Sequence, residues 1–258
     1  MKLTEAKLKQ LIKEVMTEAA KGISELPDGV YVMVEKLPTM NAFIIRYVNE
    51  KRKSPQKEFG FFGKVVIQEP PDFPCGGALM VSSAQASHGY GPLLYDIAME
   101  IASMKIGGLK GGGLISDRGA VSNRDRDEDG NTVLDADGKP KKGGALEVWK
   151  HYYYNRDSAD GEGGDVEVIQ LDDPSNILTY PKGSGKEPIN SDNCSQDIGR
   201  ATITGLYNTW IDSPLSKAYK KQPDKLKALG NKLIVVGFDL PGFGNQEDEE
   251  TEQKDLTN

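Results

Sequence analysis

The sequence has few of the residues that build metal centres or thiol chemistry. Its 258 residues include two histidines and two cysteines, His88, His151, Cys75 and Cys194. A structural zinc site needs about four nitrogen or sulfur ligands, so all four of these residues would have to converge. No Cys-x-x-Cys pair is present. We therefore expect no metal, two free thiols and a reducing, cytoplasmic location.

Other absences narrow the class of protein. No apolar run approaches the roughly 20 residues that span a bilayer, and the start of the chain has no signal-peptide core, so no membrane partner is expected. The net charge is −7, and residues 245–258 hold six acidic residues against one lysine, which leaves the rest of the chain close to neutral. Proteins that hold nucleic acid cluster their lysines and arginines, so no extended nucleic-acid surface is expected.

Apolar periodicity predicts alternating strands and helices. Residues 2–20 are predicted to form an amphipathic helix whose apolar stripe is Leu8, Leu11, Ile12, Val15, Met16 and Ala19. This helix either docks on its own domain or is offered to a protein partner. Strands are expected at 30–36, 42–49, 59–68, 78–82, 111–116, 166–171 and 232–239, and helices at 91–103, 145–156, 196–211, 214–221 and 223–229. This order predicts an α/β fold with a mixed, mostly antiparallel central sheet flanked by helices.

Composition divides the chain into four parts. They are the amphipathic helix (1–22), a core (23–171) with an insertion at 119–144, a loop with helices and a final strand (172–243), and a disordered acidic tail (244–258). The insertion contains Asp-Arg-Asp-Glu-Asp-Gly at 125–130, which matches the first half of a calcium loop. The twelfth position is Ala136 instead of glutamate, so we expect a solvated acidic hairpin there.

The stretch between the fourth strand and the helix at 91–103 is the most informative one. A strand, a short loop with Gly89 and Gly91, and a helix N-terminus form a general device for holding phosphate. Leu94 occupies the place of the third glycine of a dinucleotide-binding fingerprint. Glu187 follows a Gly-Ser-Gly-Lys segment where a phosphate loop needs Ser or Thr, and no Gly-x-Ser-x-Gly elbow exists. These enzyme classes are excluded, and a tight turn before a helix is the structural alternative.

Residues 78–102 resemble the acyl-CoA-binding motif of the GNAT acetyltransferase superfamily. Val81 ends a strand, seven residues follow, and then come Gly89-Tyr90-Gly91 and the pair Leu93-Leu94. The resemblance covers about 30–171. The stretches GYGPLLYDIAMEIA, GGLISDRGAVS and VWKHYYYNR also look like acetyltransferase-like proteins of tailed bacteriophages.

The resemblance implies an acyl-CoA N-acyltransferase-like fold with a C-terminal helical extension. It implies that acetyl-CoA is the co-substrate and that an amine-bearing substrate of unidentified type accepts the acetyl group, in the host cytoplasm or the virion. The expected cofactor-binding residues are Val81, Ser87, His88, Gly89, Tyr90 and Gly91. For His88, a loop position exposed to solvent is the alternative.

Acyl transfer to an amine needs a base, a donor for the thioester oxygen and an acid for the leaving thiolate. The backbone amide near Val81 is the expected donor, Asp117 the expected base, and Tyr152 or Tyr153 the expected acid. Ordinary core packing is the alternative for the tyrosines, and a salt bridge with Arg118 is the alternative for Asp117.

Three departures from the family pattern, one of which is the insertion at 119–144, favour a second hypothesis. Ala86 stands three residues before the first glycine, where the family carries Gln or Arg. The residues between 36 and 42 leave no room for the two helices that normally join the first two strands. The alternative is therefore a non-catalytic phage structural or host-interaction protein built on the same fold.

Overall fold

The computed structural model describes residues 21–38, 40–49, 63–70, 75–86, 89–117, 138, 144–154, 165–171, 194 and 214–242. The strands are β1 (Val30–Lys36), β2 (Ala42–Asn49), β3 (Gly63–Gln68), β4 (Leu79–Ala86), β5 (Leu114–Ser116), β6 (Val166–Gln170), β7 (Lys217–Lys221) and β8 (Leu233–Val236). The helices are α2 (Gly91–Ser103), α3 (Gly144–Tyr154) and α5 (Asp224–Leu229). Short 3-10 turns are η1 (Ile23–Glu25), η2 (Cys75–Gly77), η4 (Pro214–Ser216) and η5 (Gly230–Lys232).

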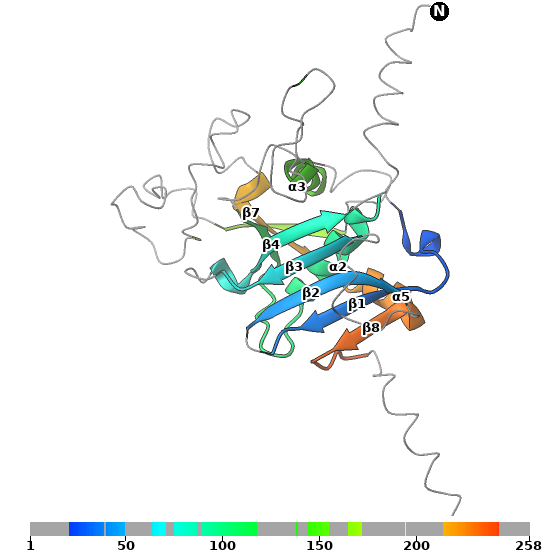
Figure 1. The fold of residues 1–258 in the computed structure, drawn as a ribbon. Helices are drawn as coiled ribbons and strands as arrows, with labels where there is room; N and C mark the ends of the chain where they lie inside the picture. Colours follow the sequence, from blue (N-terminus) through cyan, green and yellow to red (C-terminus); the bar gives the residue numbers. More distant parts are fainter. Residues whose placement is uncertain are drawn as a thin grey trace, which may run out of the picture. The chain divides into compact units, whose positions relative to one another are not determined.

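The eight strands form one mixed sheet in the order β6-β7-β5-β4-β3-β2-β1-β8 (Figure 1). This confirms the expected α/β class with a mixed sheet. The chain divides into two compact units. The first unit comprises Met1–Val66, Ser83–Ala98 and Pro223–Asn258, and the second comprises Ile67–Ser82 and Met99–Gln222. The predicted helices at 2–20 and 196–211, the acidic insertion and the acidic tail lie outside the described residues.

The first unit is built around a β1–β2 hairpin. Val30, Val32 and Val34 of β1 are buried and alternate with partly exposed residues, as a strand with one core face requires. β1 pairs antiparallel with β2 and parallel with β8. Residues 37–41 are the whole connection between β1 and β2, so no helix separates the two strands, as the sequence predicted.

Helix α2 spans exactly the residues predicted for it and carries the predicted buried stripe. Tyr95, Met99 and Glu100 are also buried, which makes α2 a helix enclosed on nearly every side. Burial raises the pKa of Tyr95 to about 12. Among the described residues, no helix is both long enough and apolar enough to cross a membrane.

Two elements of the second unit differ from the prediction, one in type and one in length. The predicted helix at 214–221 is wrong, because Pro214–Ser216 is a 3-10 turn and Lys217–Lys221 is the strand β7. Lysine and alanine favour helices in isolation, but β7 pairs antiparallel with both β5 and β6, and this pairing overrides the local preference. The predicted strand at 111–116 is shorter, since only Leu114–Ser116 pairs.

The two cysteines form a disulfide between Cys75 and Cys194, so the expectation of two free thiols is wrong. The bond lies in an apolar cluster with Ala78, Met80, Ile115 and Ala218. Cysteines 119 residues apart give no local sequence signal of pairing. Disulfides are rare in reducing compartments, so the argument that free thiols gave for a cytoplasmic location no longer holds.

The first prediction concerns this disulfide. A bond that closes a loop of 119 residues restricts the unfolded chain, and the chain-entropy estimate for such a loop is about 4–5 kcal/mol. We expect Cys75→Ser to lower the free energy of unfolding in urea, and dithiothreitol to reproduce that loss in the wild type but not in the variant. Thiol titration of the unreduced, denatured wild type should find no thiols; two reactive thiols would contradict the assignment.

Candidate functional site

The turn between β4 and α2 has the backbone that the glycine pattern predicts. Gly89 has φ +80°, a left-handed conformation that glycine adopts without steric cost. A Cβ atom on Gly91 would lie 3.3 Å from the Cβ of Ala86, so the start of α2 passes close to the end of β4. Ser87 and His88 lie outside the described residues. Of the two glycines, Gly89 therefore has the left-handed backbone expected of a turn before a helix.

Tyr90 anchors this turn to the first unit. Its side chain is 4% exposed, and its ring meets the ring of Tyr47 edge to face, with the centroids 5.5 Å apart. The Tyr47 hydroxyl donates a hydrogen bond of 2.9 Å to the carbonyl of Tyr90, and the Tyr90 hydroxyl donates one of 3.4 Å to the carbonyl of Glu25. The Tyr90 side chain therefore holds the turn from the inside, and any ligand contact at this position comes from the backbone.

Burial raises the pKa of the Tyr47 phenol well above its usual value, and the neighbouring Tyr90 and Asp96 raise it further. The phenol therefore stays protonated at neutral pH and remains a hydrogen-bond donor. This keeps the carbonyl of Tyr90 fixed on the sheet.

Lys21 is a residue at the turn that sequence reasoning missed. Its backbone N–H donates a hydrogen bond of 3.1 Å to the carbonyl of Gly89, and its ammonium lies 4.6 Å from the centroid of the Tyr90 ring. Lys21 makes no ion pair with any carboxylate of the described residues, so the aromatic ring is its cationic contact there. No spacing rule links residue 21 with residue 89, and only the fold reveals the pair.

The electrostatics of the turn favour an anion. The first amides of a helix have no acceptor within the helix, and the helix dipole places partial positive charge at that end. At α2 these amides include Gly91, while Pro92 has no N–H to satisfy. The ammonium of Lys21 adds a full positive charge at the same turn.

β4 continues beyond its partner β5. The two strands run parallel and pair from Leu79 with Leu114 to Val81 with Ser116, where β5 ends. The residues from 83 to 86 were expected to form a loop, but they belong to β4, and their side chains are exposed. On the β3 side, a Cβ on Gly63 would lie 2.6 Å from the carbonyl oxygen of Gln85, so only glycine fits there. The second half of β4 thus has backbone groups that β5 does not use.

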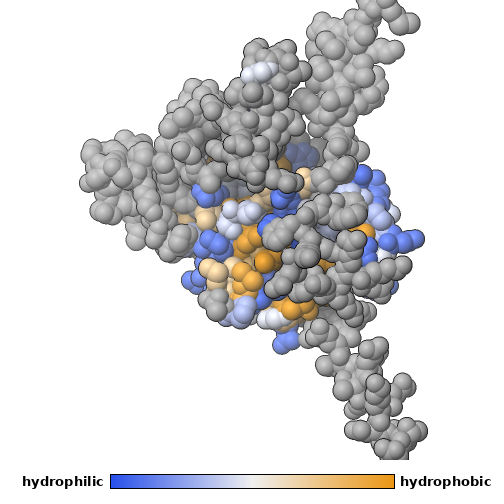
Figure 2. Space-filling model, viewed as in Figure 1, coloured by the Kyte–Doolittle hydropathy of each residue, from blue (hydrophilic) through white to orange (hydrophobic). Residues whose placement is uncertain are grey.

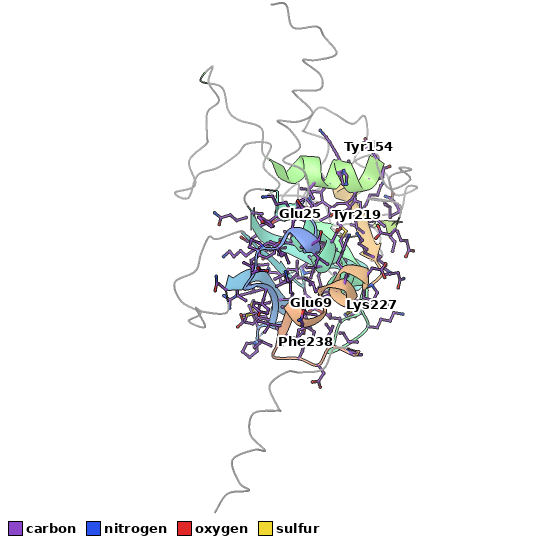
Figure 3. The ribbon with its side chains drawn as sticks, turned by 90° about the vertical axis from the view of Figure 1, so that its right-hand side faces the viewer. Glu25, Glu69, Tyr154, Tyr219, Lys227 and Phe238 are labelled. Carbon is purple, nitrogen blue, oxygen red and sulfur yellow. A yellow bond between two sulfur atoms is a disulfide. The ribbon has the colours of Figure 1, made fainter. Side chains whose placement is uncertain are left out.

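The proposed catalytic residues lie in the second unit. Asp117 is partly exposed and directly follows β5. Tyr152 is 3% exposed, and its ring centroid lies 6.5 Å from that of Tyr219, whose ring is also 5.2 Å from Trp149 in a tilted arrangement. Figure 3 labels Tyr219, and it labels Tyr154 on the same helix as Tyr152. Tyr153 is partly exposed, and the ammonium of Lys217 lies 5.6 Å from its ring centroid. The expected core-packing role therefore applies to Tyr152 more than to Tyr153.

Comparison of the chain with family models, with curated protein sequences and with solved structures gives no match. Within the described ranges, no group of three or more His, Cys, Asp or Glu side chains could hold a metal ion. The functional argument therefore rests on the turn before α2, the part of β4 that continues beyond its pairing with β5, and the residues of the second unit.

The second prediction concerns Tyr47. Replacing Tyr47 with Phe removes the buried hydrogen bond to the Tyr90 carbonyl, and we expect a loss of about 1 kcal/mol in the free energy of unfolding at pH 8. The raised pKa means that this stability is complete below about pH 10, where an unfolded tyrosine ionises, and falls as the pH rises further. Urea midpoints at pH 8 and pH 11 should show a smaller alkaline loss for Tyr47→Phe than for the wild type. Tyr154→Phe, at a residue 57% exposed, is the control, and an equal alkaline loss in all three proteins would contradict the assignment.

Proposed function

We propose that the chain is an acyl-CoA-dependent N-acyltransferase that transfers an acetyl group to an amine. The observation that carries this proposal is the course of β4, which pairs with β5 only up to Val81 and then continues, exposed, to the glycine turn. The pantetheine arm of CoA contains amide groups, and amides can bond to an open strand as an added strand does. The diphosphate of CoA would then reach the start of α2.

Two features of the turn suit a diphosphate. Gly89 adopts a backbone conformation that brings amides to the start of α2, and its carbonyl is occupied by the N–H of Lys21. The ammonium of Lys21 supplies the positive charge that position 86 lacks, because Ala86 replaces the Gln or Arg of the resembled family. Charge-assisted hydrogen bonds of this type contribute about 1.5–3 kcal/mol each.

The proposed reaction joins the amine nitrogen to the thioester carbon and breaks the carbon–sulfur bond. The proton lost by the amine goes to Asp117, and the departing CoA thiolate takes a proton from a tyrosine. We assign the second role to Tyr153, since a proton donor must reach its partner and Tyr152 is enclosed by Tyr219. The acceptor amine is a small molecule, a peptide or a modified base.

The third prediction is CoA binding at the turn. Calorimetric titration of the full chain with CoA should release heat that saturates, and Gly89→Ala should weaken the affinity at least tenfold, because a side chain is strained at φ +80°. Gly230→Ala is the matched control, since Gly230 also has a positive φ, of +51°, with open space around it, and lies at the end of α5.

The same titration with Lys21→Met measures how much the positive charge of Lys21 contributes to CoA affinity. We expect this variant to bind CoA more weakly than the wild type does. Its affinity for pantetheine, which lacks the diphosphate, should change little. Lys227→Met, at an exposed position on α5, should leave both affinities unchanged. A folded wild type that gives no heat with millimolar CoA would contradict the proposal.

The fourth prediction concerns turnover. With acetyl-CoA and a panel of amines, the release of free thiol should depend on the amine, and Tyr153→Phe should reduce the rate by 10²-fold or more, within the usual range for loss of a general acid. Tyr154→Phe, next along α3, should retain the rate. Saturable CoA binding without thiol release over the whole panel would favour the non-catalytic phage structural or host-interaction protein, which detection of the chain in purified virions would support.

A further inference from the structure

Lys217, the first residue of β7, is a lysine in an unusual place. Figure 2 shows hydrophilic residues, in blue, on the visible surface of the described part of the chain, where water can hydrate their charges. The Lys217 side chain is instead almost enclosed, since the residue is 5% exposed. Burial of a charged group costs free energy unless contacts within the protein replace the lost water, so these contacts show what the ammonium does.

Two contacts of the Lys217 ammonium define where it lies. Its Nζ donates a hydrogen bond of 2.6 Å to the Oε1 of Gln170, the residue directly opposite on β6. The same atom lies 5.6 Å from the centroid of the Tyr153 ring, within the distance at which a cation is attracted to an aromatic face. The ammonium therefore links β6 and β7 to the tyrosine that we assign as the proton donor.

Helix α3 brings Tyr153 to this position by packing along β7. Side chains two residues apart on a strand point to the same face, so Lys217 and Tyr219 share one face of β7. The ring of Tyr219 lies near the rings of Trp149 and Tyr152. Tyr153 is four residues after Trp149, on the same side of the helix, and it meets Lys217. The middle of α3 thus contacts Tyr219, and its last turn contacts Lys217.

The strand register places Lys217 near the proposed base. β5 pairs antiparallel with β7 at Leu114 and Tyr219. Two residues further along β5, this register puts Ser116 opposite Lys217. The Ser116 hydroxyl also donates a hydrogen bond of 3.2 Å to a carbonyl of η4, so the end of β5 lies beside the start of β7. Asp117 is the next residue after Ser116 and continues from this point.

The same register extends to the proposed donor for the thioester oxygen. On its other side, Ser116 lies opposite Val81 of β4. Four neighbouring strands therefore contribute one residue each to a single row, in the order Gln170, Lys217, Ser116 and Val81. In the proposed reaction the sulfur leaves from the thioester that the Val81 amide faces, so Lys217 and Tyr153 lie in the row where the leaving group needs a proton.

We propose that Lys217 is the positioning residue for Tyr153 in the acyl transfer, a role that rests on the proposed function of the chain. As the carbon–sulfur bond breaks, the sulfur keeps its electron pair and takes the proton of the Tyr153 hydroxyl, which leaves a phenolate. Tyr153 is partly exposed, so water returns a proton to it after CoA departs.

The Lys217 ammonium serves this step in two ways. Its contact with the Tyr153 ring holds the ring in one orientation, while the hydrogen bond to Gln170 holds the ammonium itself. Its positive charge attracts the negative charge that develops on the phenol oxygen as the proton leaves. Because this attraction grows towards the transition state, Lys217 affects turnover more than it affects the binding of acetyl-CoA.

Steady-state thiol release tests this role, with acetyl-CoA and the amine of the panel that gives the highest rate. Lys217→Met keeps a long side chain and removes the charge. We expect kcat to fall about tenfold or more, with little change in the KM for acetyl-CoA. Lys217→Arg keeps a cation beside the ring and should retain most of kcat.

Lys221→Met is the matched control. Lys221 lies on the same strand, is 4% exposed, and its ammonium is 3.1 Å from the carboxylate of Asp165. Loss of this buried ion pair should lower the urea midpoint at least as much as Lys217→Met does. It should leave kcat unchanged, because no printed step of the reaction involves Lys221. Equal losses of kcat in the two lysine variants would assign Lys217 to stability alone and overturn the proposal.

A double-variant cycle shows whether Lys217 acts through Tyr153. In a chain that already carries Tyr153→Phe no phenolate forms, so Lys217→Met should have no further effect on kcat. Additive losses, or a wild-type kcat in Lys217→Met, would overturn the role of Lys217 and leave the proposed acyl transfer standing. A folded wild type without amine-dependent thiol release would overturn both.

Discussion

The buried pair of Tyr47 and Tyr90 is the interaction on which the proposed site depends. Position 90 lies between two glycines, which by themselves would leave the turn many conformations. The hydrogen bond from the Tyr47 hydroxyl to the Tyr90 carbonyl and the edge-to-face ring contact select one of them. Because β2 carries Tyr47 and pairs with β1 from Phe43 to Asn49, the turn is tied to the β1–β2 hairpin of the first unit. In the proposed site, a backbone held in this way would bind an anion without the entropic cost of ordering a loop.

The sequence predicted those elements whose signal is local. β1, β2 and α2 have the predicted bounds, because their apolar residues repeat with the strand or helix period and clear turns bound them. β7 was mistaken for a helix, since Lys and Ala favour helices and only its partners β5 and β6 make it a strand. The end of β4 was mistaken for a loop for a similar reason. Small polar residues without apolar alternation give no strand signal, yet β3 is close enough at Gly63 to hold them in the sheet.

The residues of the candidate site also fall into those that the sequence revealed and those that only the fold brings together. The glycines and the helix start were recognised from sequence, because a left-handed turn before a helix needs these residue types at this spacing. Lys21 and Tyr47 were missed, since they reach the turn from separate segments and neither has a pattern that points to residue 90. The disulfide was missed as well, because a bond between distant cysteines follows from the fold and not from their spacing. Burial then separates Tyr152 from Tyr153, which helix periodicity alone left open.

Ala86 stands where the resembled family carries Gln or Arg, and the surroundings of this residue give a physical reason for the difference. The Ala86 Cβ lies 2.8 Å and 3.3 Å from the positions that Cβ atoms on Gly63 and Gly91 would occupy, so the end of β4 is crowded on both sides. A small residue suits that position, and in the proposed site the cationic group comes from a different segment, as Lys21. Lys21 directly follows the amphipathic residues 2–20, and its N–H is bonded to the turn itself.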